Sequence, residues 1–168
     1  MILPGYCQTM ARYNAWQNRE IWRIVQPMSP ADLRAERGAF FGSILGTLNH
    51  TLWGDMLWMS RFDGGAGAPV TLSESPEMTP TAAAWWAERF RTDGRIKLWA
   101  AQLDAVDLVG ELTWYSAALD RHFTKPRALC VMQMFNHQTH HRGQVHAMLT
   151  AAGQQTQITD LPFLPEDT

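Results

Sequence analysis

Residues 127–153 read RALCVMQMFNHQTHHRGQVHAMLTAAG and carry the clearest helical pattern in the chain. Because successive helix residues turn by about 100°, a helix over 127–152 gathers on one side Leu129, Cys130, Met134, His137, His141, Val145 and Met148. Such an apolar stripe is typical of a helix that faces a core of other helices, and Gly153 is a typical C-terminal stop. The segment therefore predicts a long amphipathic helix whose buried side includes two histidines.

Three further segments have a helical spacing of apolar residues. The first spans about 6–26 and ends at PMSP, where two prolines cannot continue it. The second begins at Gly42 or Ser43, where we expect an N-cap, and runs to about residue 62. The third has Pro80 in its first turn and runs to about residue 103. We therefore predict an all-α fold with four main helices in one domain over residues 1–168.

Two of the connections between these helices have distinctive sequences. Residues 63–79 include a Gly-rich run, DGGAGAP, and stay turn-like up to SPEMTP, so they form the longest irregular connection and a candidate loop to cover a site. Residues 108–125, LVGELTWYSAALDRHFTK, alternate imperfectly and are rich in β-branched and aromatic residues. This second pattern predicts a short hairpin before the last helix.

The composition of the 168 residues limits the classes of function. A net charge of −2, without any run of Lys and Arg, provides no basic surface for nucleic acid. The first residues do not resemble an export signal, and no stretch is apolar enough to span a membrane. We therefore expect a cytoplasmic protein that binds neither nucleic acid nor membranes, and in which Cys7 and Cys130 are reduced thiols.

His137 and His141 lie four residues apart, so in a helix their rings can converge on one cation. One histidine on an apolar face is more often a core residue with a hydrogen-bond partner, but two buried imidazoles both need partners, and a metal ion satisfies both. His50 shares a helical stripe with Gly46 and Gly54, which leave room beside its ring for an ion with bound water. If the two helices are neighbours, the three histidines predict a metal site with an open coordination position, as in catalytic zinc sites.

Other residues are weaker candidates for the site. Asp55 and Trp53 lie on the same predicted helix as the first histidine, and Arg142 follows the last, so we consider these three as ligand-orienting or substrate-binding residues. Cys130 lies about 10.5 Å along the helix from His137, which is too far for both to bind one ion. The catalytic residues are unknown at this point, and the sequence leaves open the roles of five residues, namely Cys7, Cys130, His122, His140 and His146.

Three stretches resemble the DinB-like family of small bacterial metal proteins: RYNAWQNREIW, GSILGTLNHTLWGDMLWMSRF and FNHQTHHRGQVHAMLTAAG. The resemblance covers about residues 6–163 and implies a four-helix bundle of the up-down-down-up type, often as a homodimer. It also implies that His50, His137 and His141 hold a divalent ion, Zn²⁺ or Ni²⁺, with water in the open position.

Members of the wider superfamily that this chain resembles include S-transferases that use bacillithiol, mycothiol or glutathione. The resemblance implies a metal-dependent S-transferase that takes a small thiol and an electrophilic substrate, because a coordinating thiol loses its proton and the thiolate is the nucleophile. Two alternatives stay open: a metal-dependent hydrolase, and a non-catalytic metal-binding protein of a stress response. No residue stands out as a general base, which suits the transferase better than the hydrolase.

Overall fold

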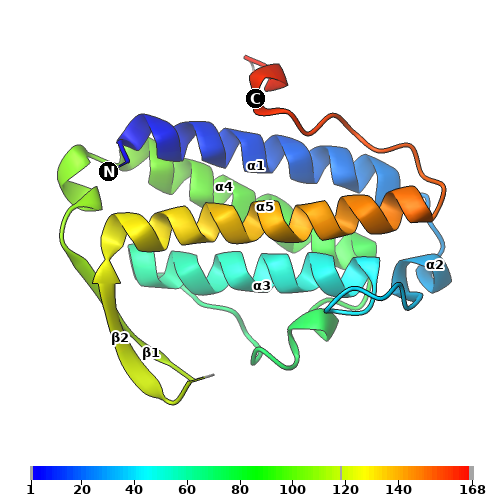
Figure 1. Ribbon diagram of the computed structural model, residues 1–168, viewed down its shortest axis with the longest axis horizontal. Coiled ribbons are helices and arrows are strands. Elements are labelled where there is room, and N and C mark those ends of the chain that lie inside the picture. The colour runs from blue at the N-terminus through cyan, green and yellow to red at the C-terminus, as the bar shows by residue number, and fades with distance from the viewer. Residues whose placement is uncertain (1, 118, 167–168) are drawn as a thin grey trace.

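Figure 1 shows the computed structural model, which describes residues 2–117 and 119–166. Four long helices lie side by side, namely α1 (Pro4–Val25), α3 (Ile44–Asp63), α4 (Ala82–Gln102) and α5 (Arg127–Ala151). Helices α1 and α5 run in one direction along the body, and α3 and α4 run in the other (Figure 1). The main packing pairs are α1 with α4, α3 with α5 and α3 with α4. In the described part of the chain, no helix is long and apolar enough to cross a membrane.

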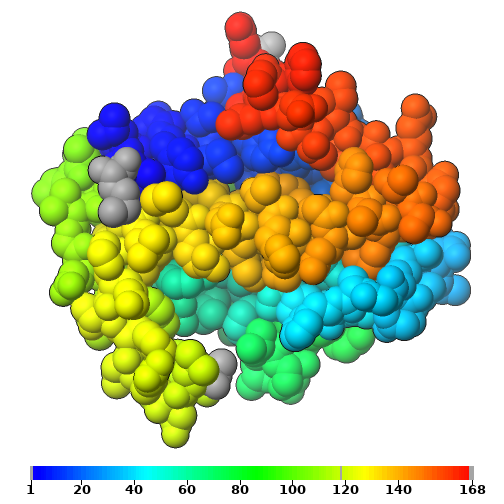
Figure 2. All heavy atoms as spheres, viewed as in Figure 1, coloured from blue at the N-terminus to red at the C-terminus, as the bar shows by residue number. Residues whose placement is uncertain are grey.

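Shorter elements connect the long helices and close the chain. They are α2 (Pro30–Arg34), η1 (Ser75–Glu77), η2 (Ala105–Leu108), β1 (Glu111–Ser116), β2 (Arg121–Pro126) and η3 (Leu161–Phe163). The two strands pair antiparallel, with Glu111 opposite Pro126 and Ser116 opposite Arg121. The predicted hairpin is therefore confirmed, and it adds a small sheet to a mostly helical fold. Figure 2 shows it projecting from the body beside the first turns of α5.

The ends of the helices follow local capping chemistry. The Ser43 hydroxyl accepts a hydrogen bond from the Gly46 amide at 3.0 Å, so the expected N-cap of α3 is confirmed. The prediction that Pro80 lies in the first turn of the next helix was wrong. Thr81 is extended at φ −145° and accepts from the Ala84 amide at 3.1 Å, so α4 begins only after this cap. Gly153 follows α5 with φ +75°, which confirms the prediction that this glycine ends the last helix.

Two apolar clusters fill the core. One includes Cys7, Ala11, Met59, Phe62, Ile96, Trp99, Met134 and Phe135, and the other includes Ile21, Val25, Ile44, Leu48, Leu52, Trp85, Val145 and Met148. Both cysteines are buried and free, which agrees with the expectation of thiols. Between the clusters lies a buried polar layer to which all four long helices contribute. It consists of Asn14, Asn18, Asp55, Arg89, Asp93, Gln138 and Arg142.

Arg89 is the centre of this polar layer. Its guanidinium lies 2.6 Å from Asp55 Oδ2 on α3 and 2.8 Å from Asp93 Oδ1 on α4, and the side chains of Arg89 and Asp55 are each only 1% exposed. Gln138 Nε2 on α5 donates to the other Asp55 oxygen at 2.9 Å. A charge this deeply buried is tolerated only when it is paired. Arg89 therefore joins α4 to α3, and Asp55 in turn joins α3 to α5 through Gln138.

The layer continues to α1 and back to α5. Asn18 Nδ2 donates to both Asp93 oxygens at 3.1 Å, and Asn14 Nδ2 donates to Oδ1 of the same carboxylate at 3.1 Å. Arg142 donates to Asn14 Oδ1. With two arginines and two aspartates the layer has no net formal charge, and its chain of hydrogen bonds links all four long helices near their middle.

Candidate metal centre

The packing of α3 against α5 brings His50, His137 and His141 to one point. Nε2 of His50 lies 3.1 Å from Nε2 of His137. The ring centres of His50 and His141 are 4.8 Å apart, and those of His137 and His141 are 4.4 Å apart. One possible ligand nitrogen from each ring lies within 4.8 Å of the others. His50 thus forms one cluster with two histidines that lie about ninety positions further along the chain. The spacing of His137 and His141 and the stripe around His50 predicted this cluster.

Gly54 makes this approach feasible. It lies one turn after His50 on α3, and a Cβ placed on it would lie 2.6 Å from Cε1 of His137. We expected Gly46 and Gly54 to leave room beside the His50 ring for an ion with bound water, but protein atoms occupy the space at both glycines. The space at Gly54 is filled by the His137 ring, and a Cβ at Gly46 would meet the Phe41 carbonyl oxygen at 2.5 Å.

The contact at Gly54 leads to a first prediction. Gly54→Ala is expected to weaken binding of Zn²⁺ or Ni²⁺ by about 10- to 100-fold, the range seen when a residue that orients a ligand is changed, because the new methyl group must displace the His137 ring. Titration calorimetry with each metal measures the effect. Gly94→Ala is the matched control, since a Cβ on Gly94 of α4 meets nothing within 4 Å. Equal affinities in the two variants would contradict the prediction.

The outer nitrogens of two histidines have hydrogen-bond partners. Nδ1 of His50 lies 3.0 Å from Ser75 Oγ on η1, and Nδ1 of His141 lies 2.7 Å from Gln144 Oε1. Donation from each Nδ1–H leaves the Nε2 lone pair free for an ion, which is the usual arrangement around metal-binding histidines. His137 Nδ1 is buried and has no partner in the described residues.

Burial keeps the three imidazoles neutral. Burial, with a smaller contribution from the neighbouring rings of His137 and His141, lowers the pKa of His50 to about 3. Burial likewise lowers the pKa of His137 to about 4 and also lowers that of His141. A neutral imidazole is the form that binds metals, so the site needs no deprotonation step at neutral pH.

These shifts predict a pH-dependent stability for the metal-free protein. Histidines of the unfolded chain titrate near pH 6.5, whereas His50 and His137 stay neutral in the folded protein down to about 3 and 4. The unfolded state therefore binds more protons below pH 6.5, and the free energy of unfolding should fall as the pH is lowered from about 6.5 to 4. Urea unfolding at a series of pH values measures this slope. The double variant His50→Gln/His137→Gln should show a smaller slope, and an unchanged slope would refute the assignment.

Two aromatic side chains surround His50. Phe41 stacks on the His50 ring with 3.7 Å between ring centres, and its centre is 5.5 Å from that of His141. Trp53 lies 5.7 Å from His50 and donates from Nε1 to the Val70 carbonyl at 2.8 Å. The long loop that was expected to cover a site is therefore held beside the histidines by Trp53. Phe41 contributes an apolar wall that excludes water from one side of the cluster.

The same loop is also anchored through Asn49, the residue before His50. Its Nδ2 donates to the carbonyl oxygens of Pro76 and Thr79 at 2.8 and 3.0 Å, and the Thr79 hydroxyl donates back to Asn49 Oδ1 at 2.6 Å. These bonds hold η1 against α3, so Ser75 is positioned for its contact with His50.

Three residues that contact the histidines were not predicted from the sequence, namely Phe41, Ser75 and Gln144. Gln144 follows His141 by three residues, so helical spacing could have identified it. Ser75 and Phe41 carry no such signal, because they belong to connections whose positions depend on the folded chain. Sequence pattern alone also gave no reason to connect Arg89 of the buried layer with the site.

The other residues that the sequence suggested for the site lie outside the three-histidine cluster. Asp55 is buried and holds Gln138, the residue after His137, so it supports the ligand helix indirectly. Arg142 points into the core, where it contacts Asn14 and lies 5.1 Å from the Tyr13 ring centre. His122 and His140 are exposed and His146 is partly buried, and none of these three belongs to the cluster.

The donor set fits a divalent metal ion. Two nitrogens bound to one ion in a tetrahedral site are about 3.3 Å apart, close to the 3.1 Å between the Nε2 atoms of His50 and His137. Imidazole suits zinc and nickel among the common divalent ions. The fold and the site therefore define a mostly helical protein whose three-histidine group could hold a metal ion.

The chain belongs to the DinB family, whose sequence profile matches residues 1–168. This assignment confirms the resemblance to that family that the sequence indicated. A search of curated proteins found no match to the chain.

Proposed function

We propose that this protein is a metal-dependent S-transferase that activates a low-molecular-weight thiol for attack on an electrophile. His50, His137 and His141 are the proposed ligands of Zn²⁺ or Ni²⁺. The observation that carries the proposal is the donor set: three neutral imidazoles converge from two helices, and among the described residues no carboxylate or thiolate belongs to the group. Three protein ligands leave a coordination position for a substrate atom.

The protein's own residues have distinct roles in this proposal. Ser75 and Gln144 orient the rings of His50 and His141 through their Nδ1 atoms. Phe41 shields the cluster from water on one side. A bound divalent ion would supply the charge that lowers the pKa of a thiol, and the resulting thiolate is the nucleophile. No protein residue then has to accept the thiol proton at the cluster, because the proton can leave to solvent.

Hydrolysis is the less favoured enzymatic alternative. It would require a general base within reach of a water molecule. Asp55 is the buried carboxylate nearest in sequence to His50, but its two oxygens are held by Arg89 at 2.6 Å and Gln138 at 2.9 Å. This engagement leaves Asp55 unsuited to proton transfer at the cluster.

Conjugation of glutathione, and separately of bacillithiol and mycothiol, to monochlorobimane tests the proposal. The zinc- or nickel-loaded protein should accelerate the reaction of at least one thiol, and His141→Ala should reduce the rate to the uncatalysed one. His140→Ala changes the exposed neighbour and should retain the activity. Equal rates for wild type and His141→Ala would refute the transferase.

The competing possibility is a non-catalytic protein in which the ion joins α3 to α5. Removal of the metal should then lower the melting temperature by many degrees, since a ligand that binds only the folded state stabilises it, while no thiol is conjugated. Calorimetric melting of metal-loaded and metal-free protein, beside the conjugation assay, separates the two functions.

A further inference from the structure

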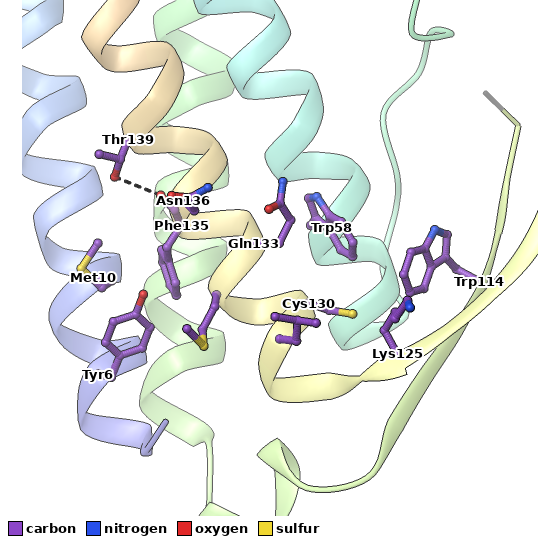
Figure 3. A pocket seen from close by; sticks show the side chains of 12 residues that line it. Tyr6, Met10, Trp58, Trp114, Lys125, Cys130, Gln133, Phe135, Asn136 and Thr139 are labelled. Carbon is purple, nitrogen blue, oxygen red and sulfur yellow. Dashed lines mark hydrogen bonds between the residues drawn. The ribbon is translucent and has the colours of Figure 1, made fainter. Parts of the chain in front are cut away.

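A second feature of the molecule lies next to the histidine cluster and has no part in holding the ion. It is a cavity of about 610 Å³ over the outer side of α5, between α1, α3 and the hairpin (Figure 3). Its lining residues are Tyr6, Met10, Trp58, Trp114, Lys125, Leu129, Cys130, Met132, Gln133, Phe135, Asn136 and Thr139. The volume falls in the range of about 300–1,000 Å³ that is usual for small-molecule sites.

The cavity begins one helical turn from the histidines. Trp58 follows Gly54, the residue beneath the His137 ring, by four positions on α3, and Gln133 precedes His137 by four positions on α5. Four residues of a helix rise by about 6 Å. Figure 3 shows Gln133 and Trp58 facing each other across the space between α5 and α3. A molecule of moderate size in the cavity can therefore reach toward the cluster.

Aromatic rings form the apolar walls of the cavity. The rings of Trp58 and Trp114 meet edge to face with 5.5 Å between centres, and those of Tyr6 and Phe135 do so at 5.8 Å. Trp114 comes from the hairpin, so the hairpin supplies one wall. Rings in these arrangements favour the burial of a further apolar or aromatic group.

The hairpin side of the cavity is positively charged. Lys125 lines it, and the Arg61 guanidinium lies 4.6 Å from the ring centre of Trp58 and 5.3 Å from that of Trp114. No Asp or Glu occurs among the described lining residues. Neither Lys125 nor Arg61 forms an ion pair within the described chain. Burial lowers the pKa of Arg61.

We propose that this cavity binds an organic carboxylate with an apolar, aromatic body. The body packs against Trp58 and Trp114 on the α3 and hairpin side of α5, and the carboxylate accepts hydrogen bonds from Lys125 with the positive charge of Arg61 close by. This binding deepens the proposed function, because it gives the electrophilic substrate an aromatic body and a carboxylate that anchors it, while the carbon attacked by the thiolate and its leaving group lie elsewhere on the body. The role of the bound molecule as substrate rests on that function. Binding itself does not require the ion.

Titration calorimetry with 2-naphthoate and its neutral analogue 2-naphthamide tests the proposal. The wild-type protein should bind the carboxylate, and Lys125→Met should weaken that binding by about tenfold or more, the effect expected from loss of a charge-assisted hydrogen bond. The chain has only two lysines, so Lys97→Met on α4 is the matched control and should bind as the wild type does. The amide should bind more weakly than the carboxylate to the wild type and equally to both lysine variants.

The outcomes separate this inference from the proposed function. His141→Ala should lose the metal and retain 2-naphthoate binding, whereas Lys125→Met should retain the metal. Absence of 2-naphthoate binding at millimolar concentration would overturn the inference even if thiols are conjugated. The same holds if the amide binds the wild type as tightly as the carboxylate, or if Lys125→Met binds the carboxylate as the wild type does.

Discussion

His141→Ala is expected to lower the affinity of the protein for Zn²⁺ or Ni²⁺ by at least about 100-fold, which is the upper end of the effect of changing a mere orienting residue. His141 lies with its ring centre 4.8 Å from that of His50 and 4.4 Å from that of His137. Its loss leaves two imidazoles, and the Gln144 side chain that positions it cannot take its place because the amide is directed at Nδ1 from outside.

The measurement is the metal content of purified, untagged protein after dialysis, by plasma mass spectrometry. Wild type should retain about one ion per chain, as a single three-histidine site predicts, and His141→Ala should retain almost none. His140→Ala is a stringent control, because it removes an exposed imidazole whose ring centre is only 4.8 Å from that of His141. Metal loss in both variants alike, or in neither, would contradict the assigned ligand set.

Arg89→Met is expected to reduce the free energy of unfolding by about 3–5 kcal/mol, the usual effect of removing one partner from a buried ion pair. Arg89 pairs with both Asp55 at 2.6 Å and Asp93 at 2.8 Å, so its loss leaves two buried carboxylates without their ion-pair partner and Arg142 as the only arginine of the layer. Burial already favours the neutral form of both carboxyl groups and raises the pKa of each, an effect that the charge of Arg89 opposes.

Urea unfolding followed by circular dichroism measures this effect. Arg91→Met, two residues further along α4, is the control, because the Arg91 side chain is 70% exposed and pairs with Glu88 on the surface. Such surface pairs contribute about 0–1 kcal/mol. A change of similar size in the two variants would show that the buried layer does not hold the helices together. Recovery of Arg89→Met only as an unfolded chain would agree with the prediction.

The buried layer and the histidine cluster are neighbours along α5. Gln138 follows His137 and donates to Asp55, and Arg142 follows His141 and donates to Asn14. On this helix the two proposed ligands are thus each followed by a residue that connects α5 to α3 or α1. Loss of Arg89 should therefore disturb the rotation of α5 that aims both histidines at His50, in addition to reducing stability.

Much of the helical pattern could be predicted from the sequence. The expected segments 6–26 and 127–152 match α1 and α5 closely, and Ser43 was correctly expected near the start of α3. The failure at Pro80 has a simple cause. Proline and threonine are both common at helix starts, and only the bond from Ala84 to the Thr81 hydroxyl shows which of the two begins α4.

Local sequence was sufficient for the pairing of His137 with His141 and for the small residue at Gly54 one turn after His50. These relations involve residues within one or two turns, whose geometry the backbone imposes. The stripe expected on α5 was correct only in part, because Leu129 is 46% exposed, whereas Val131 and Phe135 lie outside the stripe and are fully buried. The identity of Gly54's neighbour, the support from Ser75, the role of Arg89 and the cavity beside the hairpin depended on tertiary structure. Each of these joins side chains from elements distant in the chain, and their proximity results from how the helices pack, which no periodicity within a single element contains.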